Sequence, residues 1–138
     1  MNPGDAALLA LAGSPEVRAH LAYPNTGVYI VRPDGHIIWA SPSMEAVTGY
    51  RPQDLVGRNG WDIFVAPEDL PKVAEFRAML AEGDGTLWTR LLTPGGAREW
   101  FRIDTSIRGG GIVCAFHREN EPAMRHTHYF IRSRSNRA

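Results

Sequence analysis

The sequence predicts an α+β domain: a five-stranded antiparallel sheet with short helices and one longer helix on one face, preceded by an N-terminal helical leader. Three observations support this prediction. Two apolar, β-branched-rich runs flank a Pro-Asp-Gly turn, three further runs separated by glycine-rich turns fill the last part, and helix-start signals lie between the two groups. With 138 residues the chain can bury one core and is expected to form one domain.

The first 23 residues are expected to form the helical leader. Residues 5–12 show the apolar spacing of a short helix that Gly13 ends, and Ser14 and Pro15 supply the N-cap and first position of a second helix. Helices this short are not stable alone, so they must pack on another surface. The candidate contact residues of the leader are Leu8, Leu9 and Leu11.

A β-hairpin and two short helical segments follow the leader. Residues 29–32 and 36–40 are the expected strands, and the turn at 33–35 contains a proline that fixes φ and a glycine that tolerates positive φ. Ser41-Pro42 then starts a helix that ends at Gly49, and Arg51-Pro52 starts another turn that ends near residue 57.

The longer helix is predicted over residues 66–81. Pro67 lies in its first turn, and Glu68 and Asp69 place negative charge where a helix N-terminus carries partial positive charge. One face is apolar at helical spacing, and Arg77 lies at the edge of that face. The apolar positions are Val73, Phe76 and Leu80.

Three strands complete the predicted sheet, at residues 86–93, 98–107 and 111–117. The connections TPGGA and RGGG are glycine-rich turns of the kind that joins antiparallel neighbours. Alternation along 98–107 directs Phe101 and Ile103 to one face of the sheet and Trp100 to the other.

Charge and composition exclude several classes of protein. Fifteen basic and fifteen acidic residues give no net charge, which argues against a dedicated nucleic-acid binder. No apolar run approaches the roughly 20 residues of a membrane span, and the N-terminus lacks the basic residues of a signal peptide. A single cysteine, Cys114, fits a reducing compartment. We therefore expect a cytoplasmic protein without membrane contact.

The segment NTGVYIVRPDGHIIWASPSMEAVTGYRPQDLVG, followed by APEDL and later by LWTRLLTPGGAREWFRIDTSIRGGGIVCAFH, resembles a PAS domain over residues 24–118. PAS domains are small sensory modules that bacteria attach to kinases, cyclic-dinucleotide enzymes and transcription factors. The resemblance implies sensing and protein contact, not enzyme activity. It divides the chain into a leader at 1–23, the PAS domain at 24–118 and a basic C-terminal extension at 119–138.

A sheet that curves over helices encloses a volume, which is either filled by side chains or open to a ligand. The candidate lining residues are Trp39, Phe64, Val73, Phe76, Leu80, Phe101 and Ile103. Aromatic residues at such spacings are more often core than ligand contacts. Arg77 is an eighth candidate, because a guanidinium beside an apolar face must extend to solvent, pair with an acid or meet an anionic ligand.

The resemblance also limits the cofactors. Light-sensing members form a flavin adduct through a cysteine that follows Gly-x-Asn, whereas here Gly60 follows Gly57-Arg58-Asn59. Many haem-binding members use a histidine of the longer helix, whereas no histidine lies between His36 and His117. A covalent flavin adduct and haem held by that helix are therefore disfavoured, noncovalent flavin remains open, and the ligand is unknown.

Metal and enzyme sites are weaker alternatives. His126 and His128 would share one side of a strand, with His117 nearby, but no third metal ligand is specified, so surface histidines are favoured. Cys114 lies in an apolar strand and is expected to be a core residue. Asp62 and Asp104 are the acids nearest to apolar segments, as a nuclear-transport-factor-like enzyme would need, but neither has a histidine at a suggestive spacing.

Protein contact is the stronger alternative function. The resemblance implies that the leader covers the outer face of the sheet or joins a homodimer, and Trp88 and Trp100 are candidate interface anchors on that face. The extension carries a net charge of +3 from Arg118 onward and shows no heptad. It is expected to be disordered, to dock on a sheet or a partner through residues 129–131, or to act as a basic arm.

Together these features predict a sensory PAS domain that binds a small molecule or a signalling protein and relays the change through its termini. The alternative is a ligand-free dimerisation module whose core is filled by the same aromatic residues. A homodimer is expected in either case.

Overall fold

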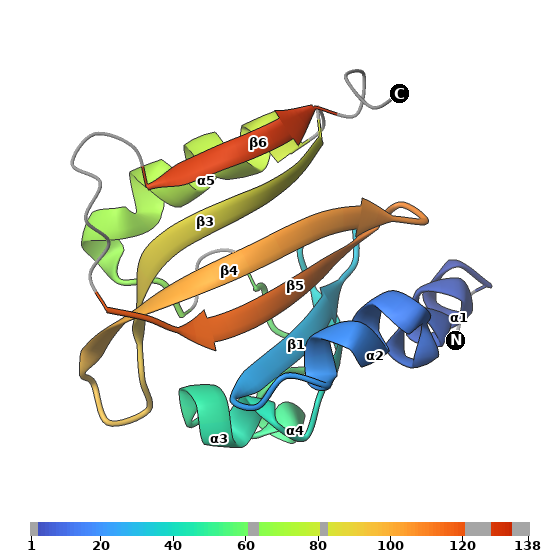
Figure 1. Cartoon of the computed structure of the whole chain (residues 1–138), viewed down its shortest axis with the longest axis horizontal. Coiled ribbons are helices and arrows are strands. Elements are labelled where there is room, and N and C mark those ends of the chain that lie inside the picture. Colours follow the sequence, from blue (N-terminus) through green and yellow to red (C-terminus); the bar gives the residue numbers. More distant parts are fainter. Residues whose placement is uncertain (1–2, 61–63, 81–82, 121–127, 134–138) are drawn as a thin grey trace.

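The computed structural model describes residues 3–60, 64–80, 83–120 and 128–133 (Figure 1). Its helices are α1 (Pro3–Ala10), α2 (Pro15–Leu21), α3 (Met44–Thr48), α4 (Pro52–Leu55) and α5 (Leu70–Met79), with 3-10 turns at Leu11–Gly13 and Pro67–Asp69. Its strands are β1 (Thr26–Val31), β2 (Ile37–Ala40), β3 (Gly83–Leu92), β4 (Arg98–Arg108), β5 (Gly111–Arg118) and β6 (Tyr129–Ser133).

The strands form one antiparallel sheet in the order β2-β1-β5-β4-β3-β6. The α+β prediction is confirmed, except that the sheet has six strands where the sequence predicts five. The sixth, β6, comes from the C-terminal extension and pairs with β3, from Leu87↔Tyr129 to Gly83↔Ser133. Residues 129–131 thus dock on the sheet of their own chain.

Local sequence explains the turns and helix ends. In the β1–β2 turn, the Asp34 carboxylate accepts a hydrogen bond from the His36 amide at 3.0 Å, and Gly35 has a φ of 97°. Only glycine adopts that conformation without steric strain. At the start of α2, Ser14 Oγ accepts a hydrogen bond from the Val17 amide at 3.3 Å, which is the expected N-cap.

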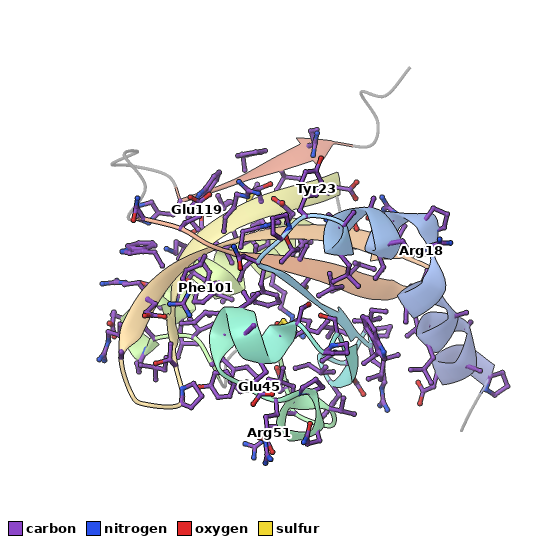
Figure 2. The ribbon with its side chains drawn as sticks, turned by 60° about the horizontal axis from the view of Figure 1, so that its bottom comes forward. Arg18, Tyr23, Glu45, Arg51, Phe101 and Glu119 are labelled. Carbon is purple, nitrogen blue, oxygen red and sulfur yellow. The ribbon has the colours of Figure 1, made fainter. Side chains whose placement is uncertain are left out.

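The helices lie on both sides of the sheet. Helices α3, α4 and α5 pack on the inner face and the leader packs on the outer face, so Glu45 of α3 and Arg18 of α2 lie on opposite sides in Figure 2. Side chains between the sheet and α3–α5 form the larger core cluster. The smaller cluster joins the leader to β1 and β5 through Leu8, Val17, Val28, Ile30, Val113 and Ala115.

The leader is also tied to the sheet by polar contacts. The Glu16 carboxylate accepts a hydrogen bond from Ser106 Oγ at 2.6 Å and lies 3.0 Å from Arg108 Nε. Of its candidate contact residues, Leu8 is buried, whereas Leu9 and Leu11 are half-buried. The leader therefore covers the β1 and β5 side of the outer face of its own sheet.

The placement of Trp39 differs from the expectation that it faces the interior. The pairing of β1 with β2 shifts register between Ile30 and Val31, so one extra residue is inserted in β2. As a result Ile38 and Trp39 both pack against the leader cluster. Within the described residues, no helix combines the length and the apolarity needed to cross a membrane.

Candidate functional site

The described side chains between the sheet and α5 are closely packed. A cavity of about 30 Å³ remains there, which has room for little more than one water molecule. Its walls are mostly apolar and come from β1, β3, β4, β5, α5 and the loop before α5. The lining residues are Tyr29, Gly60, Phe64, Val65, Val73, Leu87, Thr89, Leu91, Ile103, Thr105, Cys114 and Phe116.

The hydroxyl groups of the cavity wall already have acceptors within the protein. The three donations are Tyr29 to the Gly60 carbonyl at 2.8 Å, Thr105 to the Gly85 carbonyl at 3.0 Å, and Thr89 to the Asp69 carboxylate at 3.1 Å. Among the buried side chains that the structure describes, the one nitrogen or oxygen without a hydrogen-bond partner is Arg102 Nε. Among the described lining residues, every side-chain hydroxyl therefore already donates a hydrogen bond within the protein.

The structure brings together part of the predicted pocket. Phe64, Val73 and Ile103 line the cavity. Phe76, Leu80 and Phe101 are buried in the core around it. Trp39 lies on the outer face, and Arg77 is exposed on α5 because it points away from the buried face of that helix. Six of the seven aromatic and aliphatic candidates thus belong to the packed core, whereas Trp39 and Arg77 lie outside it.

Sequence reasoning did not single out Tyr29, Thr89 or Thr105. Their signal is period-two alternation: Thr105 shares a strand face with Phe101 and Ile103. Burial raises the pKa of the Cys114 thiol and of the Tyr29 phenol well above their ordinary values. Cys114 therefore stays a neutral core residue in the cavity wall.

Asp69 connects the start of α5 to β3. Its carboxylate accepts hydrogen bonds from the Arg90 amide at 2.8 Å, from Arg90 Nη2 at 2.5 Å and from Thr89, and it lies 3.6 Å from Lys72 Nζ. Burial acts to raise the pKa of Asp69, but the hydrogen bonds from Arg90 and the charge of Lys72 outweigh it and lower the pKa to about 2. This ion-pair cluster holds α5 over the interior.

The outer face beside that cluster carries Trp100. Lys72 Nζ and the Arg90 guanidinium lie 5.2 and 5.3 Å from the centre of the Trp100 ring, within cation–π distance. The His128 ring approaches the same indole edge-on, with 5.3 Å between centroids. Trp100 is half-buried, so part of its ring is exposed between the side chains of Lys72 and Arg90.

Trp88 continues this aromatic surface toward the sheet edge. Its ring centre lies 5.8 Å from that of Phe130, a side chain with 47 % exposure. No described helix covers this half of the outer face, because α1 and α2 pack on the β1 and β5 side (Figure 1). We call Trp88, Trp100 and Phe130 the aromatic surface.

Asp104 lies on the same face and not in the cavity. It accepts a hydrogen bond from Thr86 at 3.0 Å and lies 3.4 Å from His117 Nε2 and 3.5 Å from Arg102 Nε. Burial acts to raise its pKa, but the contacts to His117 and Arg102 lower the pKa overall. An ionised, paired carboxylate outside the cavity does not match a buried acid–base catalyst. Asp62 lies outside the described residues.

The other candidate chemistry is limited. Among the described residues, no three histidine, cysteine, aspartate or glutamate side chains are grouped so that they could hold a metal ion. His117 and His128 belong to different surroundings, one beside Asp104 and one beside Lys72, and His126 lies outside the described residues.

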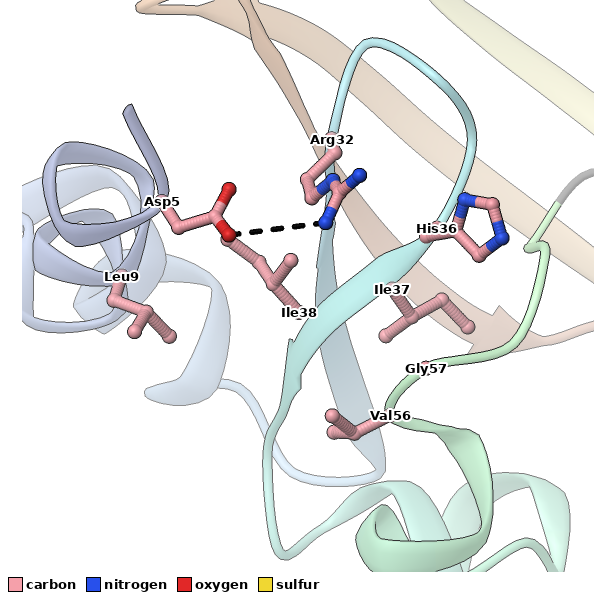
Figure 3. Close-up of a pocket in the computed structure, with 8 residues that line it drawn as sticks. All are labelled: Asp5, Leu9, Arg32, His36, Ile37, Ile38, Val56 and Gly57. Carbon is pink, nitrogen blue, oxygen red and sulfur yellow. Dashed lines mark ion pairs between the residues drawn. The ribbon is translucent and has the colours of Figure 1, made fainter. Parts of the chain in front are cut away.

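An open groove of about 450 Å³ separates α1 from the β1–β2 hairpin (Figure 3). Leu9, Ile38 and Val56 give it apolar walls, and Arg32 bridges it with Nη1 at 3.7 Å from the Asp5 carboxylate. Arg32 also pairs with Asp34, which neighbours it on the hairpin. The groove therefore lies between the leader and the sheet, and the ion pair of Arg32 with Asp5 spans it.

Solved structures share this architecture. A light-oxygen-voltage domain studied with a flavin analogue has a TM-score of 0.68 and 22% identity, covering 80% of this chain and 88% of its own. A domain of a sensor histidine kinase/response regulator from Geobacter sulfurreducens has a TM-score of 0.61 and 16% identity, covering 74% and 93%. The RpfR quorum-sensing receptor PAS domain of Cronobacter turicensis, in complex with BDSF, has a TM-score of 0.54 and 18% identity, covering 71% and 97%.

At identities this low, the structural similarity establishes the fold alone. No curated protein matches the chain. Family membership is established by sequence. The family model described as PAS domain matches residues 25–117, about two thirds of the chain. The match spans the hairpin, the helices over the cavity and the last three strands predicted from sequence. The chain therefore belongs to the PAS domain family.

Proposed function

We propose that this PAS domain acts in signalling as a protein-interaction module, and that the partner contacts the aromatic surface of the outer sheet face. The observation that carries the proposal is the contrast between a filled interior and a partly open aromatic surface. The cavity that the described residues enclose measures about 30 Å³, whereas ligand sites commonly measure roughly 300 to 1,000 Å³.

In the described part of the chain, the hydroxyl donors of the cavity wall are already used. Small-molecule pockets present a few convergent polar groups, but the hydroxyls of Tyr29, Thr89 and Thr105 are already hydrogen-bonded within the protein. A ligand that accepted a hydrogen bond from one of these hydroxyls would first have to break the existing bond. Each broken bond would oppose binding by about 1 kcal/mol.

The aromatic surface has the composition of a contact site. Tryptophan and arginine are the residues that most often dominate binding energy, and Trp88, Trp100 and Arg90 lie together here. The cations around Trp100 favour a partner that brings acidic groups to the rim and an apolar side chain to the ring. Such a partner would be a signalling protein or a second copy of the chain.

Site-specific photocrosslinking tests this proposal. The probe p-benzoylphenylalanine replaces Trp88 in the full chain, in cells of its source, and a matched probe replaces Arg51, which lies on the opposite side of the sheet (Figure 2). We expect a discrete protein adduct from position 88 and none from position 51. Trp100→Glu should lower the adduct yield at least about fivefold. Equal yields from both probes, or no effect of Trp100→Glu, would contradict the proposal.

Small-molecule sensing in the interior is the second candidate function. It is favoured by the position of the remaining cavity between α5 and the sheet and by its apolar walls. The RpfR PAS domain, which has this fold, is seen in complex with BDSF and with C12:0. A ligand larger than this cavity would require the side chains between α5 and β3 to move apart.

A further inference from the structure

Strand β6 forms one edge of the sheet. The strand order ends with β6, and among the described residues no strand pairs with its other side (Figure 1). An edge strand presents a row of backbone N–H and C=O groups that a strand of another chain can bind.

The direction of these groups follows from the pairing with β3. The Trp88 amide donates to the His128 carbonyl at 2.7 Å, so His128 directs its backbone polar groups toward β3. In an antiparallel strand this direction alternates from residue to residue. Phe130 and Arg132 therefore face β3 with their backbone groups, whereas Tyr129, Ile131 and Ser133 direct theirs to the open edge.

This edge lacks most of the features that protect exposed strands. The sequence of β6 is YFIRS, which has no proline and no lysine, and its pairing with β3 runs in regular register without a bulge. Exposed apolar side chains flank the edge: Phe130 lies on the outer face, and Met79, with 38 % exposure, lies on the α5 side with its sulfur 3.6 Å from the Tyr129 hydroxyl.

Arg132, the one charged residue of β6, can pair with an aromatic residue of the same strand in a second copy. We propose that β6 of a second copy pairs antiparallel with this β6 about a two-fold axis at Ile131. Tyr129 then lies opposite Ser133, and Phe130 lies opposite Arg132, once on each side of the axis. Directly opposite side chains come within about 5 Å, so each guanidinium reaches the Phe130 ring of the other copy in a cation–π contact.

A two-fold axis at Ile131 pairs more residues of β6 than an axis at a neighbouring residue would. An axis at Ile131 includes all five residues of β6 in each copy and forms about six backbone hydrogen bonds. An axis at Arg132 would place two guanidinium groups opposite each other, which is destabilising. The central register is therefore the one in which the open groups, the apolar side chains and the charges all find partners.

The arrangement extends the sheet and orients both copies. A two-fold axis between paired edge strands stands perpendicular to the sheet, so both outer faces look to the same side. The two aromatic surfaces then face one direction and can engage a bivalent partner. The proposed pairing does not depend on that partner, because it uses the edge of β6 and not the face.

Sedimentation equilibrium of the full chain tests the proposal with two matched variants. Phe130→Arg and Phe130→Glu both remove the phenyl ring and its contact with Trp88, but only the first places like charges opposite Arg132 of the other copy. We expect a reversible dimer of the wild type, a dissociation constant raised at least about tenfold by Phe130→Arg, and a value within about threefold of wild type for Phe130→Glu. A wild type that stays monomeric to about 1 mM, or two variants with equal effects, would overturn the proposal.

A second measurement needs no variant. Amide hydrogen exchange of the wild type should slow at Tyr129 and Ile131 as protein concentration rises, because their N–H groups become bonded only in the dimer. The amide of Phe130, which faces β3, serves as the internal control and should be protected at every concentration. Exchange at Ile131 that is independent of concentration would contradict the pairing even if a dimer forms.

Discussion

Replacing Asp69 with asparagine should destabilise the fold, and the loss should depend on pH. The Asp69 side chain is 5 % exposed and binds Arg90, Thr89 and Lys72, which together fix the start of α5 to β3. Asparagine keeps the shape of the side chain but, like the protonated acid, carries no charge. The variant therefore isolates the contribution of the ionised carboxylate.

The magnitude follows from the pKa of Asp69, which is about 2 in the folded protein against an ordinary value of 3.8. Each pKa unit corresponds to about 1.4 kcal/mol, so ionisation stabilises the fold by about 2 kcal/mol at pH 7. Because the folded-state pKa is the lower one, this stabilisation is complete above about pH 5 and is lost as the pH falls through 3.8 toward 2. About half of it remains at pH 3.

Urea unfolding of the wild type and of Asp69→Asn, followed by tryptophan fluorescence at pH 7 and pH 3, measures this effect. The difference in unfolding free energy should be about 2 kcal/mol at pH 7 and about 1 kcal/mol at pH 3. Glu68→Gln is the matched control, because Glu68 pairs with Arg98 at the surface, and its midpoint should stay close to wild type. A difference for Asp69→Asn that is zero at pH 7, or that is the same at both pH values, would refute the reasoning.

Three further substitutions or treatments test the packing. A Cβ at Gly85 would lie 2.7 Å from Phe76, so Gly85→Ala should lower stability by about 1–3 kcal/mol in urea unfolding, whereas Gly95→Ala, where a Cβ meets nothing within 4 Å, should have little effect. Leu8→Ala should lower stability by about 2–5 kcal/mol and half-buried Leu9→Ala by clearly less; equal losses would contradict the packing of the leader. Cys114 should react with a thiol reagent only as fast as the protein unfolds, because burial keeps its pKa high; rapid reaction of the native protein would place the thiol outside the core.

Features that depend on neighbouring residues could be predicted from the sequence. The Pro-Asp-Gly turn, the N-cap at Ser14 and the buried face of α5 each follow from interactions within a few residues, and the structure contains all three. The alternation along β4 likewise separates Phe101 from Trp100, because strand side chains alternate faces.

Features that depend on distant pairing could not be predicted in the same way. Trp39 faces the leader because of a register shift that only the pairing of β1 with β2 reveals. The apolar run at 129–131 indicates docking on a sheet or a partner, but its partner strand β3 lies more than 30 residues earlier, so the sequence does not identify that strand. The contact of Asp69 with Arg90 spans 21 residues and depends on how α5 crosses β3.

The candidate site shows the same division. The apolar lining residues Phe64, Val73 and Ile103 could be predicted because core positions follow hydrophobic periodicity. The degree of filling could not, because it depends on how all the side chains fit together in three dimensions. The same residues are therefore compatible with a ligand pocket and with a filled core, and the cavity volume distinguishes the two.

Native mass spectrometry with an ultraviolet–visible spectrum, on the 138-residue chain purified without added cofactor, tests the filled interior most directly. We predict that the mass equals that of the polypeptide or its dimer and that no absorbance appears beyond that of aromatic side chains. A bound small molecule of stoichiometric amount, released on unfolding, would contradict the account and would make the interior cavity the functional site.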